Sequence, residues 1–359
     1  MLSRDFTLPP KQTGSSVWIG SDLAKRENEW LAHLSPAEIS ELESAAEPLV
    51  NDSFNIGTMT QAQFVLPNLS KKLNVLRNEL ISGRGFAVLR DLPVSSYSER
   101  EAATIFYGIG LHLGLARSQN AAGHVLGHVR NLGASSDNPN VRIYQTTERQ
   151  TFHTDSSDVV GLICLQAGKS GGLSQLVSAQ TIYNEILDNR PDLLTPLLDP
   201  IATDRRGEVP NGMLPYLLIP VFSWFKDCLT PFYQRQYIDS AQRFEEAPRL
   251  TPKHTEALNY FDDLANNPEL NLSMQLEKGD MQFVYNHALL HDRTAFEDWP
   301  EFERKRHLLR LWLSVPRDRP LPAEFATRFG SVEIGNRGGI VVPGSQFCVP
   351  WSSDLPSYS

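Results

Sequence analysis

Apolar residues in the first third of the chain recur with the spacing of an amphipathic helix. One such stripe, which predicts a helix over residues 69–82, consists of Leu69, Leu73, Leu76 and Leu80. Gly83 follows the stripe and is typical of a helix end. Two more helices are predicted after Ser35 and Ser98, because each serine is followed three residues later by a glutamate that can complete a capping box.

From about residue 124 the pattern changes to short apolar or alternating runs separated by turn residues, which is typical of β-strands. The predicted strands cover residues 85–90, 159–165, 173–177, 281–285 and 307–315, and a further helix covers 179–187. Many strands with a few helices predict an α+β fold that is mainly β. We expect a double-stranded β-helix (jelly-roll or cupin-like) barrel with flanking helices.

We interpret residues 1–359 as a single domain without internal repeats. Its expected parts are an N-terminal arm with helices (1–80), a first part of the barrel (81–187), an insertion or lid (188–276), a second group of strands (277–320) and a C-terminal tail (321–359). The insertion is rich in prolines and aromatic residues, and the tail is rich in glycine, proline and serine, so we expect the tail to pack as coil.

Composition narrows the class of protein. With 33 Lys and Arg against 42 Asp and Glu, the net charge of -9 argues against a nucleic-acid or anionic-membrane partner. The three cysteines form no Cys-x-x-Cys pair, and no apolar run reaches membrane-spanning length. These features predict a cytoplasmic protein that acts on a small molecule. They leave its oligomeric state open, a homo-oligomer included.

The motif His153-Thr154-Asp155, together with the distant His291, offers two imidazoles and one carboxylate. This is the ligand set of a non-haem Fe(II) site that keeps open coordination positions. If His153 and Asp155 lie at the end of a strand, alternation places both side chains on one face, where a neighbouring strand can supply the third ligand. A histidine hydrogen-bonded to a nearby aspartate is also an ordinary structural pair, so the motif alone leaves both interpretations open.

A second pattern lies in the strand predicted after residue 305. One face carries Arg306, Leu308, Arg310 and Trp312, and the other carries His307, Leu309, Leu311 and Leu313. The second face is suited to packing against helices, so we expect the first to point into the barrel. A buried arginine needs an anion, which is either an acidic side chain of the protein or the carboxylate of a small molecule.

Six segments then form a set with a familiar order and spacing. They are His153 to Asp155, Gly171 to Ser174, Gly279-Asp280, Asn286, Leu290 to Phe296, and Arg306 to Trp312. The set resembles the taurine dioxygenase (TauD/TfdA) family of Fe(II)- and 2-oxoglutarate-dependent oxygenases. The resemblance covers roughly residues 80 to 316.

The resemblance implies roles for individual residues. His153, Asp155 and His291 would be the iron ligands. Arg306 would hold the distal carboxylate of 2-oxoglutarate, and Ser174, after the double glycine, would support it. The cofactors implied are Fe(II), with 2-oxoglutarate as co-substrate and dioxygen as oxidant.

For the substrate, the implied contacts are less specific. Arg310, four residues beyond Arg306, matches a position that in some family members meets an anionic group of the substrate. Gln119, Tyr144 and Thr146 precede the metal motif and are candidates for the mouth of the site.

Two neighbours of the distal histidine need comment. Asp292 stands where relatives often carry glycine, which could alter the local turn without removing a ligand. His287 lies four residues before His291, but the segment from Leu290 to Arg293 matches the family motif better, so we assign the ligand to His291.

The implied activity is oxidation of a C–H bond in a small, anionic or amino-acid-like substrate, with release of succinate and carbon dioxide. Halogenation is not expected, because related halogenases leave the position of Asp155 free for halide. Two alternatives stay open: a catalytically silent jelly-roll protein that binds metal and 2-oxoglutarate, and a cupin-type metalloenzyme that does not use 2-oxoglutarate. The intact ligand set weighs against the first, and Arg306 with Ser174 weighs against the second.

Overall fold

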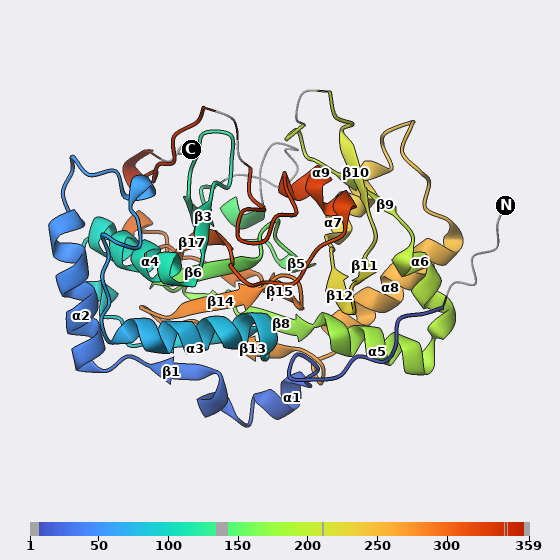
Figure 1. The fold of residues 1–359 in the computed structure, drawn as a ribbon, viewed down its shortest axis with the longest axis horizontal. Coiled ribbons are helices and arrows are strands. Elements are labelled where there is room, and N and C mark those ends of the chain that lie inside the picture. Colours follow the sequence, from blue (N-terminus) through green and yellow to red (C-terminus); the bar gives the residue numbers. More distant parts are fainter. Residues whose placement is uncertain (1–6, 134–142, 210–211, 341, 343, 355–359) are drawn as a thin grey trace.

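The computed structural model describes residues 7–133, 143–209, 212–340, 342 and 344–354. In these residues the larger of two main sheets has seven strands (Figure 1). They are β1 (Leu31–His33), β2 (Phe86–Arg90), β14 (Met281–Tyr285), β6 (Val159–Gln166), β17 (His307–Ser314) and β3 (Leu115–Arg117), with β4 (Leu126–Arg130) paired to β17. Only the β1–β2 pair is parallel among the described pairs of this sheet.

The smaller main sheet carries the metal motifs. Its four antiparallel strands are β13 (Leu272–Met274), β8 (Ser174–Ser178), β15 (Leu289–Arg293) and β5 (Gln150–His153). Two-stranded pairs are β9 (Ile201–Asp204) with β10 (Tyr216–Ile219), β11 (Phe222–Phe225) with β12 (Cys228–Pro231), and β7 (Ser170–Gly171) with β16 (Phe296–Glu297). In the described residues these pairings give separate sheets and no single closed sheet. Together with the helices, they make a mixed α/β fold that consists mostly of sheets.

The helices flank the sheets. They are α1 (Gly20–Leu23), α2 (Pro36–Ala46), α3 (Leu69–Ser82), α4 (Glu99–Leu113), α5 (Ala179–Asn189), α6 (Leu194–Leu198), α7 (Arg235–Ala241), α8 (Pro252–Asn266) and α9 (Ala326–Phe329). Both predicted capping boxes are confirmed at Ser35 and Ser98, and the leucine stripe of α3 is buried as expected. All described helices are too short or too polar to span a bilayer.

The two faces of strand β17 have different neighbours, as the alternation of its residues predicts. Leu311 packs on α4 so closely that a Cβ on Gly110 would lie 2.2 Å from its Cδ2 atom. On the opposite face, Arg306, Leu308 and Arg310 line a cavity beside the metal motifs. One strand therefore builds the core on one side and the site on the other.

The insertion shares its core with the smaller sheet. Phe152, Val177 and Leu290 of β5, β8 and β15 belong to the same buried cluster as residues of α5, α6, α8 and β11. The N-terminal arm runs along α5, where the Asn184 side chain accepts from the Gln12 backbone N–H and donates to its carbonyl (Figure 1). Residues of the insertion and of the smaller sheet therefore pack into one buried cluster.

Some elements differ from the prediction. Strand β13 is short and was not predicted, because its burial depends on partners far away in sequence. Strands β5 and β15, which carry His153 and His291, were expected without residue ranges. The tail was expected to be coil, but it contains α9 and a fully buried arginine, Arg337. The prediction of coil is therefore wrong at α9, whereas Arg337 lies in coil as expected, although its side chain is fully buried.

Candidate metal centre

His153 and His291 lie side by side on adjacent strands. They are direct partners in the β5–β15 register, and their ring centroids are 4.1 Å apart. Asp155 follows two residues after His153, and its carboxylate lies 3.9 Å from His153 Nε2 and 3.8 Å from His291 Nε2. The donor atoms of the three residues all fall within 4.8 Å of one another. The structure thus brings the predicted triad together.

Surrounding hydrogen bonds orient two of these side chains. His153 Nδ1 donates to the Thr151 carbonyl oxygen at 2.9 Å, so its Nε2 atom carries the lone pair. That lone pair accepts from Gln150 Nε2 at 3.0 Å, and a bound metal would take the place of this contact. The indole Nε1 of Trp312 donates to Asp155 Oδ2 at 2.8 Å. Such partners fix the ring and carboxylate orientations that a metal requires.

Burial sets the charge state of the triad. Burial, together with the neighbouring His153 and Arg310, lowers the pKa of His291 to about 3. Burial alone would raise the pKa of Asp155, but the Arg310 guanidinium and the hydrogen bond from Trp312 hold that pKa below its usual range. At neutral pH the site therefore offers neutral imidazole from His291 and a carboxylate, which is the protonation state that metal binding needs.

Two cavities meet at the triad. The inner cavity is narrow, about 40 Å³, and lies between the two main sheets, with Ser174, His291 and Arg306 in its wall. The outer cavity, about 280 Å³, is lined by polar side chains of the insertion and of α9. His153 and Arg310 line both.

The Arg306 guanidinium lines the inner cavity without a direct protein anion, although the charge of Asp298 acts on its pKa. The residue is 6% exposed, forms no ion pair with any described residue, and its Nη1 atom has no hydrogen-bond partner. Burial lowers its pKa to about 10. Ser174 lines the same cavity and donates from Oγ to Gln282 Oε1 at 2.8 Å. A buried, unpaired arginine is unfavourable unless an anion joins it, so this cavity fits a carboxylate.

Three of the four predicted substrate residues line the outer cavity. Arg310 lies over the ring of Tyr144, and its Nε donates to Gln119 Oε1 at 2.7 Å. Its Nη1 atom lies 3.8 Å from Asp155 Oδ2, so a protein carboxylate is near it. Thr146 is buried and lines neither cavity, so its predicted substrate contact stays without structural support.

Comparisons with known proteins identify the family of this chain. The sequence model described as "Taurine catabolism dioxygenase TauD, TfdA family" matches residues 46–312. The chain belongs to the TauD/TfdA family. It is also 32% identical to FR-33289 synthase of Streptomyces rubellomurinus (strain ATCC 31215), over 88% of this chain and 94% of that protein. Family membership makes the protein an iron- and 2-oxoglutarate-dependent oxygenase.

Solved structures show the same fold at low sequence identity. An asparagine oxygenase in complex with Fe(II), 2S,3S-3-hydroxyasparagine and succinate has a TM-score of 0.62, with 15% identity over 79% of this chain and 93% of that chain. The non-heme iron oxygenase OrfP in complex with Fe and alpha-ketoglutaric acid has a TM-score of 0.60, with 13% identity over 79% and 93%. These likenesses establish a fold typical of TauD-family oxygenases.

Two residues of this TauD/TfdA member were not assigned to the site from sequence. Trp312 was placed on the inward face, but its hydrogen bond to the Asp155 carboxylate could not be predicted from the sequence. Arg293 lines the inner cavity, and burial and the nearby Arg306 lower its pKa to about 9. Asp292, the departure from the family pattern, pairs with Arg149 Nη2 at 2.7 Å and is not part of the ligand set. His287 also lies outside the triad.

Proposed function

We propose that the protein binds Fe(II) through His153, Asp155 and His291 and oxidises a C–H bond of a small anionic, amino-acid-like substrate. The observation that carries the proposal is the buried Arg306, whose guanidinium forms no ion pair with a described residue and lines a cavity that adjoins the triad. When bound, iron would supply the oxidising power together with dioxygen and 2-oxoglutarate, and the 2-oxoglutarate would be converted to succinate and carbon dioxide.

The chain's own residues divide the work between the two cavities. Arg306 holds the distal carboxylate of 2-oxoglutarate through a charge-assisted pair, with the Ser174 hydroxyl beside it. The two main sheets act as the two halves of a jelly-roll barrel, with the inner cavity between them. Because the inner cavity is narrow and apolar residues such as Leu308 line it, the co-substrate is shielded from water there.

The substrate occupies the outer cavity in this proposal. Arg310 reaches that cavity between Tyr144 and Trp312, with its guanidinium carbon 4.9 and 5.0 Å from the two ring centroids. Both ends of the Gln119 amide are bound within the protein. Its oxygen accepts from Arg310 Nε, and its nitrogen donates to two backbone carbonyls. We therefore assign Gln119 to orienting Arg310, and Arg310 to an anionic group of the substrate. The asparagine oxygenase with the same fold was solved with a hydroxylated amino acid.

Anaerobic titration with Fe(II) and 2-oxoglutarate tests the metal and co-substrate assignments. We expect one equivalent of Fe(II) and a weak visible charge-transfer band when both are present. His291→Ala should lose metal binding, whereas His287→Ala, which keeps all three ligands, should retain one equivalent. Metal binding without the band would favour the cupin-type alternative. Metal loss in His287→Ala with retention in His291→Ala would refute the ligand assignment.

A substrate screen tests the substrate class and separates an active enzyme from a silent binding protein. Succinate formation would be measured with amino acids and related carboxylates, sulfonates and phosphates, and with neutral analogues of matched size. We expect only anionic compounds to stimulate turnover in wild type, and Arg310→Ala to raise their KM. Stimulation by neutral compounds alone, or an unchanged KM in an Arg310→Ala enzyme that still binds Fe(II), would contradict the proposal.

A further inference from the structure

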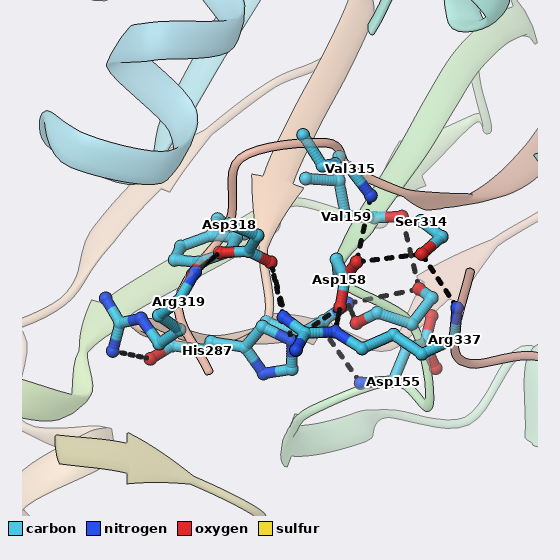
Figure 2. A network of polar contacts seen from close by, with 12 residues as sticks. Asp155, Asp158, Val159, His287, Ser314, Val315, Asp318, Arg319 and Arg337 are labelled. Carbon is cyan, nitrogen blue, oxygen red and sulfur yellow. Dashed lines mark hydrogen bonds and ion pairs between the residues drawn. The ribbon is translucent and has the colours of Figure 1, made fainter. Parts of the chain in front are cut away.

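A network of buried charges lies directly behind the metal centre. Asp158, His287 and Arg337 are at most 1% exposed and Asp318 is 6% exposed. Figure 2 shows the four converging from separate segments. Arg337 Nε donates to Asp158 Oδ1 at 2.7 Å, and its Nη2 donates to Asp318 Oδ2 at 2.8 Å. The acidic groups and the histidine could in isolation hold a metal ion. The guanidinium already bridges both carboxylates, so we assign the cluster to structure.

The contacts of Asp158 keep its carboxylate in the charged form. Burial would raise the pKa of Asp158, but the hydrogen bond from His287 Nε2 and the charge of Arg337 hold it below its usual range. The second carboxylate oxygen accepts from Ser314 Oγ and from the Val315 backbone N–H. Removing the guanidinium would leave two buried carboxylates without their shared cation, which is strongly unfavourable.

The network is joined to the metal ligand by the turn that contains it. We call residues 155–158 the Asp155 turn. Its first N–H, that of Asp155, donates to Asn286 Oδ1 at 3.0 Å, and its last carbonyl, that of Asp158, accepts from the Asn286 N–H at 2.9 Å. Asn286 is the neighbour of His287, so the same segment contacts both the turn and the charged network.

The C-terminal segment closes the other side of the turn. The Gly339 N–H donates to the Ser156 carbonyl at 2.8 Å. Gly338 must approach so closely that a Cβ there would lie 2.9 Å from the same oxygen, at a φ of +79° that favours glycine. Arg337 immediately precedes these two glycines. Its bonds to Asp158 and Asp318 therefore hold the segment against the turn that presents Asp155.

We propose that Arg337 is a positioning residue for the metal ligand Asp155, acting through Asp158 and the contact of Gly339 with Ser156. This inference rests on the proposed role of Asp155 as an iron ligand. It assigns part of the iron site to the C-terminal segment, which lies beyond the family match at residues 46–312. The physical reason is that a metal ligand on a turn needs neighbouring contacts to fix its geometry, since the turn itself has no strand partner.

Arg337→Met tests the proposal, because methionine fills similar space without charge or hydrogen bonds. A matched control is Arg90→Met, which breaks another bidentate pair: Arg90 Nε and Nη2 donate to the two carboxylate oxygens of Asp280 at 2.8 and 2.7 Å. Asp280 is fully buried, and neither residue lines the two cavities. Thermal unfolding of the apo proteins and anaerobic Fe(II) titration with saturating 2-oxoglutarate would be measured for both, at a temperature where each is folded.

We expect both variants to lower Tm, but only Arg337→Met to weaken Fe(II) binding, by about tenfold or more, as outer contacts of metal ligands do. Equal Fe(II) affinity in Arg337→Met and wild type would overturn the inference. If Arg337→Met does not fold, Arg337→Lys and Asp158→Asn give the same test, since both keep the volume but lose one side of the bridge. Failure of wild type itself to bind Fe(II) would instead refute the proposed function.

Discussion

At the scale of single residues, the site is defined by charges that the protein leaves incompletely matched. Arg306 is buried without an ion pair to any described residue, and its Nη1 atom has no hydrogen-bond partner. By contrast, the buried Arg337 is bonded to two carboxylates. Both arginines are buried, but Arg306 is able to bind an anionic ligand, whereas the charge of Arg337 is already balanced by the protein and stabilises the fold.

Arg306→Ala should lower the affinity for 2-oxoglutarate by about tenfold or more, because a hydrogen bond to a charged group contributes ~1.5–3 kcal/mol. Arg306→Lys should recover only part of this loss, since an ammonium cannot form the two parallel bonds of a guanidinium. The measurement is titration of the charge-transfer band with 2-oxoglutarate. Fe(II) affinity, measured alone, should change little. An unaltered 2-oxoglutarate affinity in Arg306→Ala would shift the anchoring role to Arg310 or Arg293.

Trp312→Phe should weaken Fe(II) binding by about tenfold, because it removes the donor that orients Asp155 while it keeps an aromatic ring. Trp224→Phe is the control, since Trp224 lies on β11 in the insertion and lines neither cavity at the triad. Anaerobic Fe(II) titration compares the two. Equal affinities in the variants would show that the indole does not set the carboxylate orientation.

At the scale of elements, strands and turns place these residues in the correct order. β17 directs one face to α4 and the other to the cavities, so a one-residue shift in its register would exchange the two sets. The turn before β8 is equally specific. Gly172 has a φ of +67°, and a Cβ on it would lie 3.0 Å from Arg306 Nε.

Gly172→Ala should therefore lower both stability and 2-oxoglutarate affinity, because it strains the backbone and displaces the arginine. Gly330→Ala is a matched control: its φ of +72° is similar, but a Cβ there would meet nothing within 4 Å. Both variants should lose ~1–2 kcal/mol of stability from the left-handed conformation. Only Gly172→Ala should lose 2-oxoglutarate affinity in the band titration. A parallel loss in both variants would mean that strain alone, and not contact with Arg306, affects the site.

At the scale of the whole molecule, the buried polar groups outside the site influence global stability. His128 and His307 lie on paired strands, and His307 Nε2 donates to His128 Nδ1 at 2.8 Å, because His128 Nε2 is used for the Pro350 carbonyl. Burial, together with the neighbouring His128 and Arg130, lowers the pKa of His307 to about 2. His307 is thus neutral in the fold at any pH where the fold is stable.

This pair predicts a pH dependence of unfolding. In the unfolded chain a histidine has a pKa of about 6.5, so below that pH the unfolded state binds one proton more than the folded state. The stability contribution of His307 is present above pH ~6.5 and is lost as the pH falls. Between pH 7 and pH 5, wild type should lose about 2 kcal/mol more than His307→Gln. Urea unfolding at several pH values measures this difference, and parallel curves for the two proteins would contradict it.

Local patterns were sufficient for much of this protein. Serine caps followed by glutamate fixed the starts of two helices, the leucine spacing fixed α3, and strict alternation fixed both faces of β17. The triad could be proposed for the same reason. A His-x-Asp motif at a strand end presents both side chains locally, and only the position of the third ligand depends on the fold.

What the sequence could not decide are contacts between segments that lie far apart in the chain. The β5–β15 register that pairs His153 with His291, the indole bond from Trp312 to Asp155, and the bridge of Arg337 to Asp158 all join residues more than a hundred positions apart. No local period encodes such a pair, because each depends on how two sheets and a tail are packed against one another. Residue type and spacing therefore determined the chemistry of this protein, while tertiary packing decided which side chains hold that chemistry in place.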